Sequence, residues 1–142
     1  MIFTCNFANW KKIPLPTTPI SIARHPPRNW DGLEYHDLFP PKELLYLYKN
    51  GLVDEKKYAE FYKKQVLDVL SPADVVNSLY DNRKENDCAI VLLCYEHSQK
   101  FCHRHLVSKW LIEHGFVVKE FAILPKFKRT LGLRNYDNHS LF

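Results

Sequence analysis

The most hydrophobic segment of the chain runs without a break over residues 88–94. A polar stretch follows it, and apolar residues then recur with helical spacing until a glycine that is typical of a helix end. A short apolar run that ends in polar residues is typical of a strand buried on both faces of a parallel sheet. The pattern predicts a central strand, a loop and a helix whose first turn holds Cys102, His103 and Arg104.

Strands and helices alternate along the rest of the chain. Apolar runs predict strands over residues 1–6, 19–23 and 116–121. Helical spacing, preceded by proline or by capping residues, predicts helices over residues 40–50, 54–70 and from residue 71 onward. This alternation predicts an α/β fold, a three-layer Rossmann-like domain with a mostly parallel sheet of four to five strands and helices on both faces.

With 142 residues, 46% of them hydrophobic, the chain is large enough for one domain with an ordered core. We expect a single domain over residues 1–124 and a basic tail over residues 125–142, where periodicity is weak. The net charge of +4 permits a polyanionic partner. Because no apolar run approaches the ~18 residues of a membrane span and the N-terminus does not read as a secretory signal, we expect a cytoplasmic protein without a membrane partner. The oligomeric state stays open.

The four cysteines are expected to be reduced and without a metal ion. Cys5, Cys88 and Cys94 lie in apolar strand-like runs, where a thiol behaves as a small hydrophobic side chain. The chain has no CxxC pair, and His103 and His105 would point in different directions from a helix. We therefore expect no metal site and no cofactor.

The candidate site follows from the rule that ligands bind at the carboxyl ends of the strands in an open parallel sheet. An aromatic and basic loop over residues 28–35 is expected to cover that end of the sheet, and its rings, with Tyr95, could stack on a base. The strand ends, the start of the following helix and this loop together supply the predicted site residues. They are Asn6, Arg24, Trp30, Tyr35, Tyr95, Glu96, Cys102, His103 and Arg104.

Cys102 is the strongest candidate for a catalytic residue. A cysteine at a helix N-terminus, beside His103 and Arg104, is expected to have a lowered pKa and to act as a nucleophile, with His103 or Glu96 as the proton carrier. The alternative is that Cys102 packs into the junction of helix and sheet while Arg104 pairs with Glu96.

The two arginines are candidates for phosphate binding. A guanidinium group offers a planar fork for two hydrogen bonds to phosphate, so Arg24 and Arg104 are expected to neutralise a phosphate-bearing ligand. The alternative is that they form internal ion pairs, with Glu96 or Asp31 as the partner.

Four short segments carry a resemblance to a known family. The sequence LLCYE at residues 92–96, followed by FCHR at residues 101–104, resembles the signature of domain-of-unknown-function family 488. The turn at residues 7–9 and the sequence SIAR at residues 21–24 are also similar to its bacterial and phage members. The resemblance extends to about residue 121 and implies a small Rossmann-like α/β protein with a Cys-His-Arg motif, without implying an activity.

Three functions stay open from the sequence. The leading hypothesis is a pocket for a phosphate-bearing ligand, either a nucleotide or a nucleic-acid end, with any chemistry carried by Cys102, Glu96 and His103. The second is a non-catalytic binding or regulatory module in which the Cys-His-Arg motif is structural. The third is hydrolysis of an N-glycosidic bond by Glu96. Whether the protein is an enzyme is not decided by the sequence.

Overall fold

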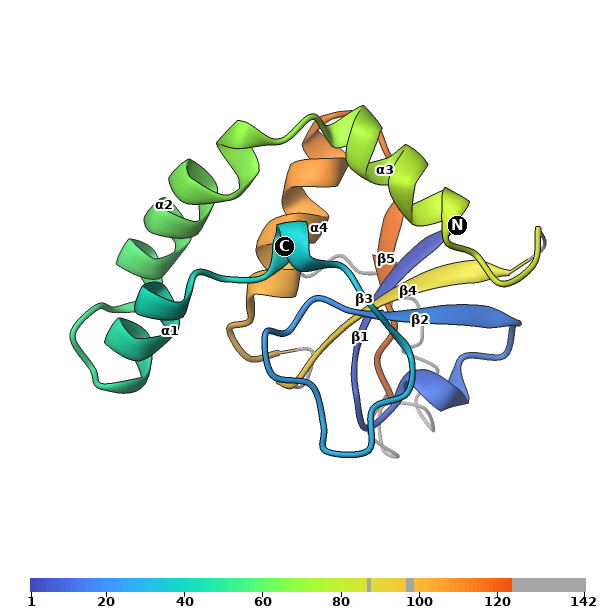
Figure 1. Ribbon diagram of the computed structural model, residues 1–142, viewed down its shortest axis with the longest axis horizontal. Coiled ribbons are helices and arrows are strands. Elements are labelled where there is room, and N and C mark those ends of the chain that lie inside the picture. The colour runs from blue at the N-terminus through green and yellow to red at the C-terminus, as the bar shows by residue number, and fades with distance from the viewer. Residues whose placement is uncertain (87, 97–98, 124–142) are drawn as a thin grey trace, which may run out of the picture.

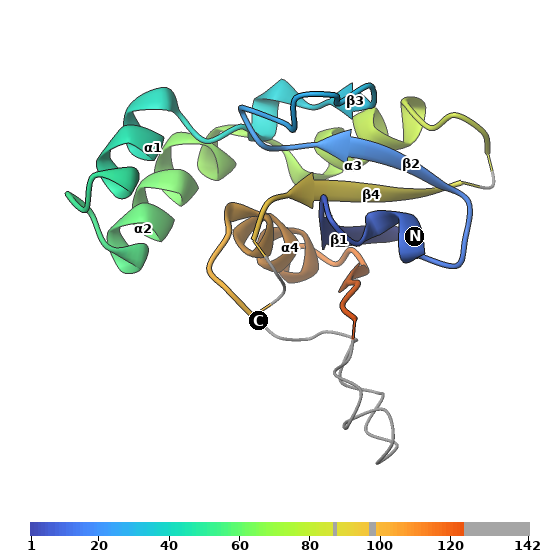
Figure 2. The same cartoon turned by 90° about the horizontal axis from the view of Figure 1, so that it is seen from below.

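A five-stranded parallel sheet forms the centre of the computed structural model, which describes residues 1–86, 88–96 and 99–123 (Figures 1 and 2). Every strand pairing is parallel, and the order across the sheet is β3-β2-β4-β1-β5. The strands are β1 (Ile2–Asn6), β2 (Thr17–Ser21), β3 (Leu33–Glu34), β4 (Ala89–Cys94) and β5 (Val118–Glu120). The predicted central strand is confirmed, because β4 lies in the middle and all six of its residues are buried.

Four α-helices and three short 3-10 helices connect the strands. The α-helices are α1 (Lys42–Lys49), α2 (Glu55–Gln65), α3 (Pro72–Asp81) and α4 (His103–Glu113). The 3-10 helices are η1 (Trp10–Lys12), η2 (His36–Leu38) and η3 (Leu67–Val69). The capping residues act as predicted, since the Asp54 side chain accepts from the Lys57 amide and the Ser71 hydroxyl accepts from the Asp74 amide.

The two faces of the sheet are covered differently. Ile90 and Leu92 of β4 pack in one large cluster with buried residues of all four α-helices. Val91 and Leu93, which point the other way, pack with Ile13 and with aromatic side chains from η1 and the loop near residue 30. The predicted three-layer Rossmann-like α/β class is thus confirmed, with η1 and its neighbouring loops as the third layer.

The α1–α2 pair lies beyond the carboxyl ends of β2 and β4 (Figure 2). The two helices pack on each other and on the residues before α4 through aromatic rings. Tyr48 of α1 lies 5.2 Å from Tyr58 of α2, and both rings approach Phe101, at 5.6 and 5.2 Å between centroids. This packing builds a wall next to the edge of the sheet where parallel α/β proteins bind ligands.

Three predicted elements differ in detail. The helix predicted over residues 54–70 ends at Gln65, and η3 continues it after a break at Val66; Val66 and Leu67 are both buried. The loop predicted over residues 28–35 contains the short edge strand β3. The second strand begins at Thr17, before Pro19. Proline is tolerated there because even-numbered residues such as Ile22 bond to β4, which leaves the Pro19 nitrogen on the β3 side, and β3 pairs only with Ile20 and Ser21.

No helix in the described part of the chain combines the length and the apolar character needed to cross a membrane. The predicted basic tail over residues 125–142 lies outside the described residues.

Candidate functional site

A cavity of about 470 Å³ opens at the carboxyl ends of β2 and β4. The ends of these two strands, the start of α4 and the facing sides of α1 and α2 form its walls. Its volume is within the range of small-molecule binding sites. The lining side chains that carry charge or can take part in chemistry are Arg24, His25, Tyr48, Lys49, Glu55, Tyr58, Tyr95, Glu96, Lys100, Cys94, Cys102 and His103.

Two thiols and one imidazole meet at the floor of this cavity. Cys94 is the last residue of β4, Cys102 is the N-cap of α4 and His103 is its first residue. Their sulfur and nitrogen atoms all lie within 4.8 Å of one another, and all three residues are buried. The site therefore joins the end of the central strand to the start of the helix that follows it.

The orientation of the His103 ring is fixed by a hydrogen bond from Nε2, the ring nitrogen that faces away from the thiols. Nε2 donates a hydrogen bond of 2.7 Å to the Ile22 carbonyl oxygen, which can only accept. The proton on Nε2 leaves Nδ1 facing the thiols, 3.5 Å from the sulfur of Cys94. The ring of Tyr62 packs against His103 at 5.5 Å between centroids, which further restricts its orientation.

The pKa values of the two thiols are shifted in opposite directions. Burial raises the pKa of Cys102, but the hydrogen bond from the Cys94 thiol and the positive charge of nearby Arg104 work against burial, and the pKa lies well below the ordinary thiol value. The pKa of Cys94 lies well above that value, because its thiol hydrogen bond to Cys102 and its burial both favour the protonated form. Cys102 is thus the thiolate of the pair and Cys94 the donor to it. All four cysteines are free, as predicted.

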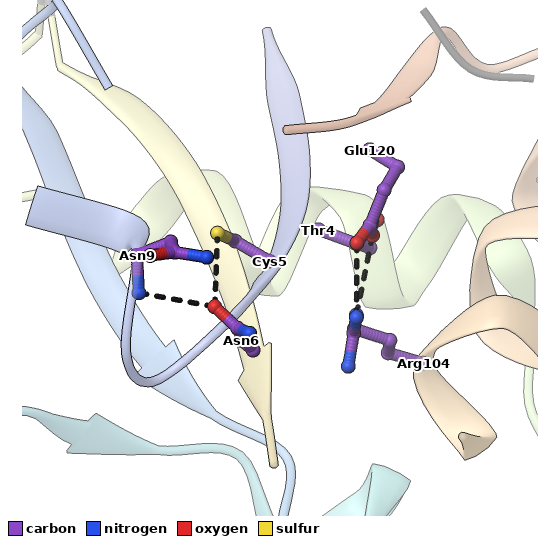
Figure 3. Close-up of polar contacts among 6 residues, drawn as sticks. All are labelled: Thr4, Cys5, Asn6, Asn9, Arg104 and Glu120. Atoms are coloured by element: carbon purple, nitrogen blue, oxygen red, sulfur yellow. Dashed lines mark hydrogen bonds and ion pairs between the residues drawn. The ribbon is translucent and has the colours of Figure 1, made fainter. Parts of the chain in front are cut away.

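Arg104 points away from the cavity into the protein. Its Nη2 and Nε donate to Glu120 Oε2 and Oε1 at 2.9 and 3.2 Å, and the Thr4 hydroxyl donates to Oε1 at 2.6 Å (Figure 3). Thr4 and Glu120 are direct partners in the β1–β5 register, and the Arg104 side chain is fully buried. The alternative that pairs Arg104 with Glu96 is therefore wrong, because the guanidinium group lies between α4 and β5 rather than at the pocket.

The structure brings five of the predicted site residues into the cavity walls: Arg24, Tyr95, Glu96, Cys102 and His103. The Arg24 Nε donates to the Pro40 carbonyl at 3.0 Å, and the Tyr95 hydroxyl donates to the His25 carbonyl. Glu96 is exposed at the rim.

Four predicted residues lie outside the cavity walls. The Asn6 side chain accepts from the Asn9 amide at 3.0 Å within a turn (Figure 3), and Arg104 pairs with Glu120. Trp30 packs with the aromatic layer on the opposite face of the sheet, and Tyr35 packs against the large cluster on the helical face. These four side chains support the architecture around the pocket.

Sequence reasoning missed the walls that α1 and α2 contribute. Tyr48 and Tyr58 belong to apolar stripes that predicted only helix packing, and Lys49 and Lys100 carried no distinguishing signal. The folding of the α1–α2 pair over the carboxyl end of the sheet gives Tyr48, Lys49 and Tyr58 their place in the pocket, and Lys100 reaches it from the connection before α4.

A family model, DUF488-N3a, described as the active DUF488-N3 subclade, matches residues 3–115. The chain belongs to the DUF488 family. The resemblance seen in the sequence is thereby confirmed, and the matched segment of this DUF488 protein contains every residue that lines the cavity. Neither the curated proteins nor the solved structures contained a match to the chain.

Replacing Glu120 should destabilise this DUF488 protein strongly. In Glu120→Gln the Arg104 charge stays buried without its counterion, and removing one partner of a buried pair costs about 3–5 kcal/mol. Urea unfolding followed by circular dichroism measures the loss. The control is Glu113→Gln, at the exposed end of α4, which should stay within about 0.5 kcal/mol of the wild type. A loss below about 1 kcal/mol in Glu120→Gln would contradict a supporting role for the pair.

Alkylation of Cys102 should depend weakly on pH in the folded protein. An ordinary thiol loses thiolate about tenfold per pH unit below its pKa, whereas the lowered pKa of Cys102 keeps its thiolate populated. Between about pH 8 and about pH 6, in buffer with a chelator, we expect the rate of Cys102 modification by iodoacetamide to fall less in the folded protein than in the unfolded chain, as read by peptide mass spectrometry. In the urea-unfolded chain the alkylation rate of the same residue should fall steeply as the pH is lowered over that interval. Equal pH dependence in both states would refute a stabilised thiolate.

Proposed function

We propose that the cavity binds a phosphate-bearing ligand, a nucleotide or the end of a nucleic acid, and that Cys102 carries the chemistry performed on it. The observation that supports this most directly is the convergence of cationic side chains and a helix N-terminus on a cavity with a thiolate at its floor. Arg24, Lys49 and Lys100 line the walls and outnumber the two carboxylates, Glu55 and Glu96. Once the Cys102 thiolate is counted, three cations face three anions, so Arg24, Lys49 and Lys100 favour a phosphate as its direct hydrogen-bonding and ion-pairing partners.

The start of α4 adds a further contact for an anion. The helix has eleven residues, and its N-cap, Cys102, makes no side-chain hydrogen bond to the helix amides. The positive end of the helix dipole therefore faces the cavity floor, where it favours a phosphate oxygen or a thiolate. The buried Arg104 charge lies behind the same point and is balanced by Glu120.

The chemistry assigned to Cys102 follows from its neighbours. The Cys102 thiolate is the nucleophile that attacks an electrophilic atom of the ligand, and a leaving group takes a proton from a nearby acid. The Cys94 thiol, which already donates a hydrogen bond to Cys102, is the candidate proton donor at the floor, and Glu96 lies exposed at the rim of the same cavity. The description of the matched subclade as active also favours a catalytic protein over a purely structural Cys-His-Arg motif.

Removing the two lysines of the pocket should abolish phosphate binding without unfolding the protein. Lys49→Gln/Lys100→Gln keeps the side-chain length but lowers the charge of the walls by two. We expect ATP, AMP and a 5′-phosphorylated oligonucleotide to raise the melting temperature of the wild type in a thermal-shift assay. The double variant should lose this shift, and the wild-type shift should shrink as salt rises.

The matched control is Lys56→Gln/Lys64→Gln, which removes the same charge from exposed positions on α2 outside the cavity. It should respond to the ligands as the wild type does. Equal losses in both double variants would indicate nonspecific attraction to a basic protein, and no shift with any phosphate ligand in the wild type would refute the proposal.

A further inference from the structure

The sulfurs of Cys94 and Cys102 and the imidazole of His103 form a compact set of metal-ligand atoms at the floor of the cavity. The sequence argued against such a set because Cys94 ends a buried apolar run. The structure places that end of the run at the cavity, next to the first turn of α4. We propose that Cys94, Cys102 and His103 bind one zinc ion.

The spacing of the ligand atoms suits a tetrahedral ion. Zinc bonds of about 2.3 Å to sulfur and about 2.0–2.1 Å to nitrogen place those two atoms about 3.6 Å apart. The Cys94 sulfur and His103 Nδ1 lie 3.5 Å apart. The whole set spans no more than 4.8 Å, and two tetrahedral sulfurs need about 3.8 Å, so a movement of about 1 Å or less completes the site.

His103 already has the orientation of a metal-binding histidine. Such histidines coordinate through one ring nitrogen and donate the other N–H to a carbonyl or carboxylate, which fixes the tautomer and the ring direction. The Nε2–H of His103 donates to the Ile22 carbonyl at 2.7 Å, and Nδ1 faces the thiols. The hydrogen bond to Ile22 thus orients the ring before an ion binds.

The charges also balance. Two thiolates neutralise one Zn²⁺, and the proton that Cys94 holds in the metal-free protein passes to solvent when the ion binds. Arg104, whose charge acts on both thiols, is paired with Glu120 at 2.9 Å and adds no uncompensated positive charge. Soft thiolate ligands with one imidazole favour zinc over magnesium or calcium, which prefer oxygen.

The ion would keep one position open toward the cavity. All three ligands line the cavity walls, and three protein ligands with an open fourth position are the arrangement of catalytic rather than structural zinc. The fourth position would take water or a phosphate oxygen of the ligand. Only the choice of the phosphate oxygen rests on the proposed function; the three protein ligands do not. In the zinc-bound form Cys102 would be a metal ligand, so the nucleophilic role proposed for its thiolate applies to the metal-free protein.

Cobalt titration of the metal-free protein tests the site. Protein stripped with a chelator and kept reduced should bind one Co²⁺ per chain, with a thiolate-to-cobalt charge-transfer band and the intense visible bands of tetrahedral cobalt. One equivalent of Zn²⁺ should abolish both. Cys94→Ser and Cys102→Ser should each weaken the charge-transfer band, and His103→Ala should lower the cobalt affinity. Cys88→Ser, at a cysteine outside the set, should behave as the wild type.

A second measurement needs no variant. Zinc added to the wild type should protect Cys102 from iodoacetamide while leaving the modification of Cys88 unchanged. Absence of a thiolate band in the folded wild type, or zinc that leaves Cys102 as reactive as before, would overturn the inference. Phosphate binding is measured separately on the metal-free protein, so a failure of the zinc site and a failure of the phosphate pocket are distinguishable.

Discussion

The burial of β4 between β1 and β2 is the constraint on which the rest of the structure depends. A strand with neighbours on both sides satisfies its backbone hydrogen bonds within the sheet, so its side chains can be apolar throughout. Each fully buried leucine or isoleucine of such a strand contributes about 1.5–3 kcal/mol. Because every pairing is parallel, the polar residues that follow β2 and β4 emerge at the same edge of the sheet. The cavity lies at that edge.

The connection from β4 to α4 turns this edge into a chemical site. Only seven residues separate Cys94 from Cys102, and the helix begins directly after Cys102. The strand end and the helix start therefore stay close, and the two thiols meet. On the other side of α4, the buried pair of Arg104 and Glu120 fastens the same helix turn to β5. One turn of helix thus faces the pocket with Cys102 and His103 and faces the core with Arg104.

The residues of the Cys-His-Arg motif have different roles although they are consecutive in the sequence. Successive residues of a helix point about 100° apart, and here His103 faces the cavity while Arg104 faces β5. His103 bonds to the end of β2 through Ile22, and Arg104 bonds to β5. The motif therefore ties α4 to two separate strands while it supplies a thiolate to the cavity. A rigid attachment of this kind is what a site needs when its ligand atoms must keep their spacing.

The sequence by itself determined most of the architecture. An apolar run such as residues 88–94 and helical stripes such as those of α2 are local signals, because strand and helix periods differ along the chain. The capping by Asp54 and Ser71 was equally readable. The placement of Arg24, Glu96 and Cys102 at one edge also followed from the sequence, since parallel topology brings strand ends together.

Only the tertiary structure decided which side chains from distant parts of the chain contact one another. Glu120 is sixteen residues from Arg104, and its pairing depends on the register of β5 against β1. Lys49 and Tyr58 enter the cavity because α1 and α2 pack over the sheet edge, and Cys94 faces His103 because the loop between them returns the chain to the end of the strand. Such contacts depend on how elements pack in three dimensions, and no local pattern of apolar and polar residues records that packing.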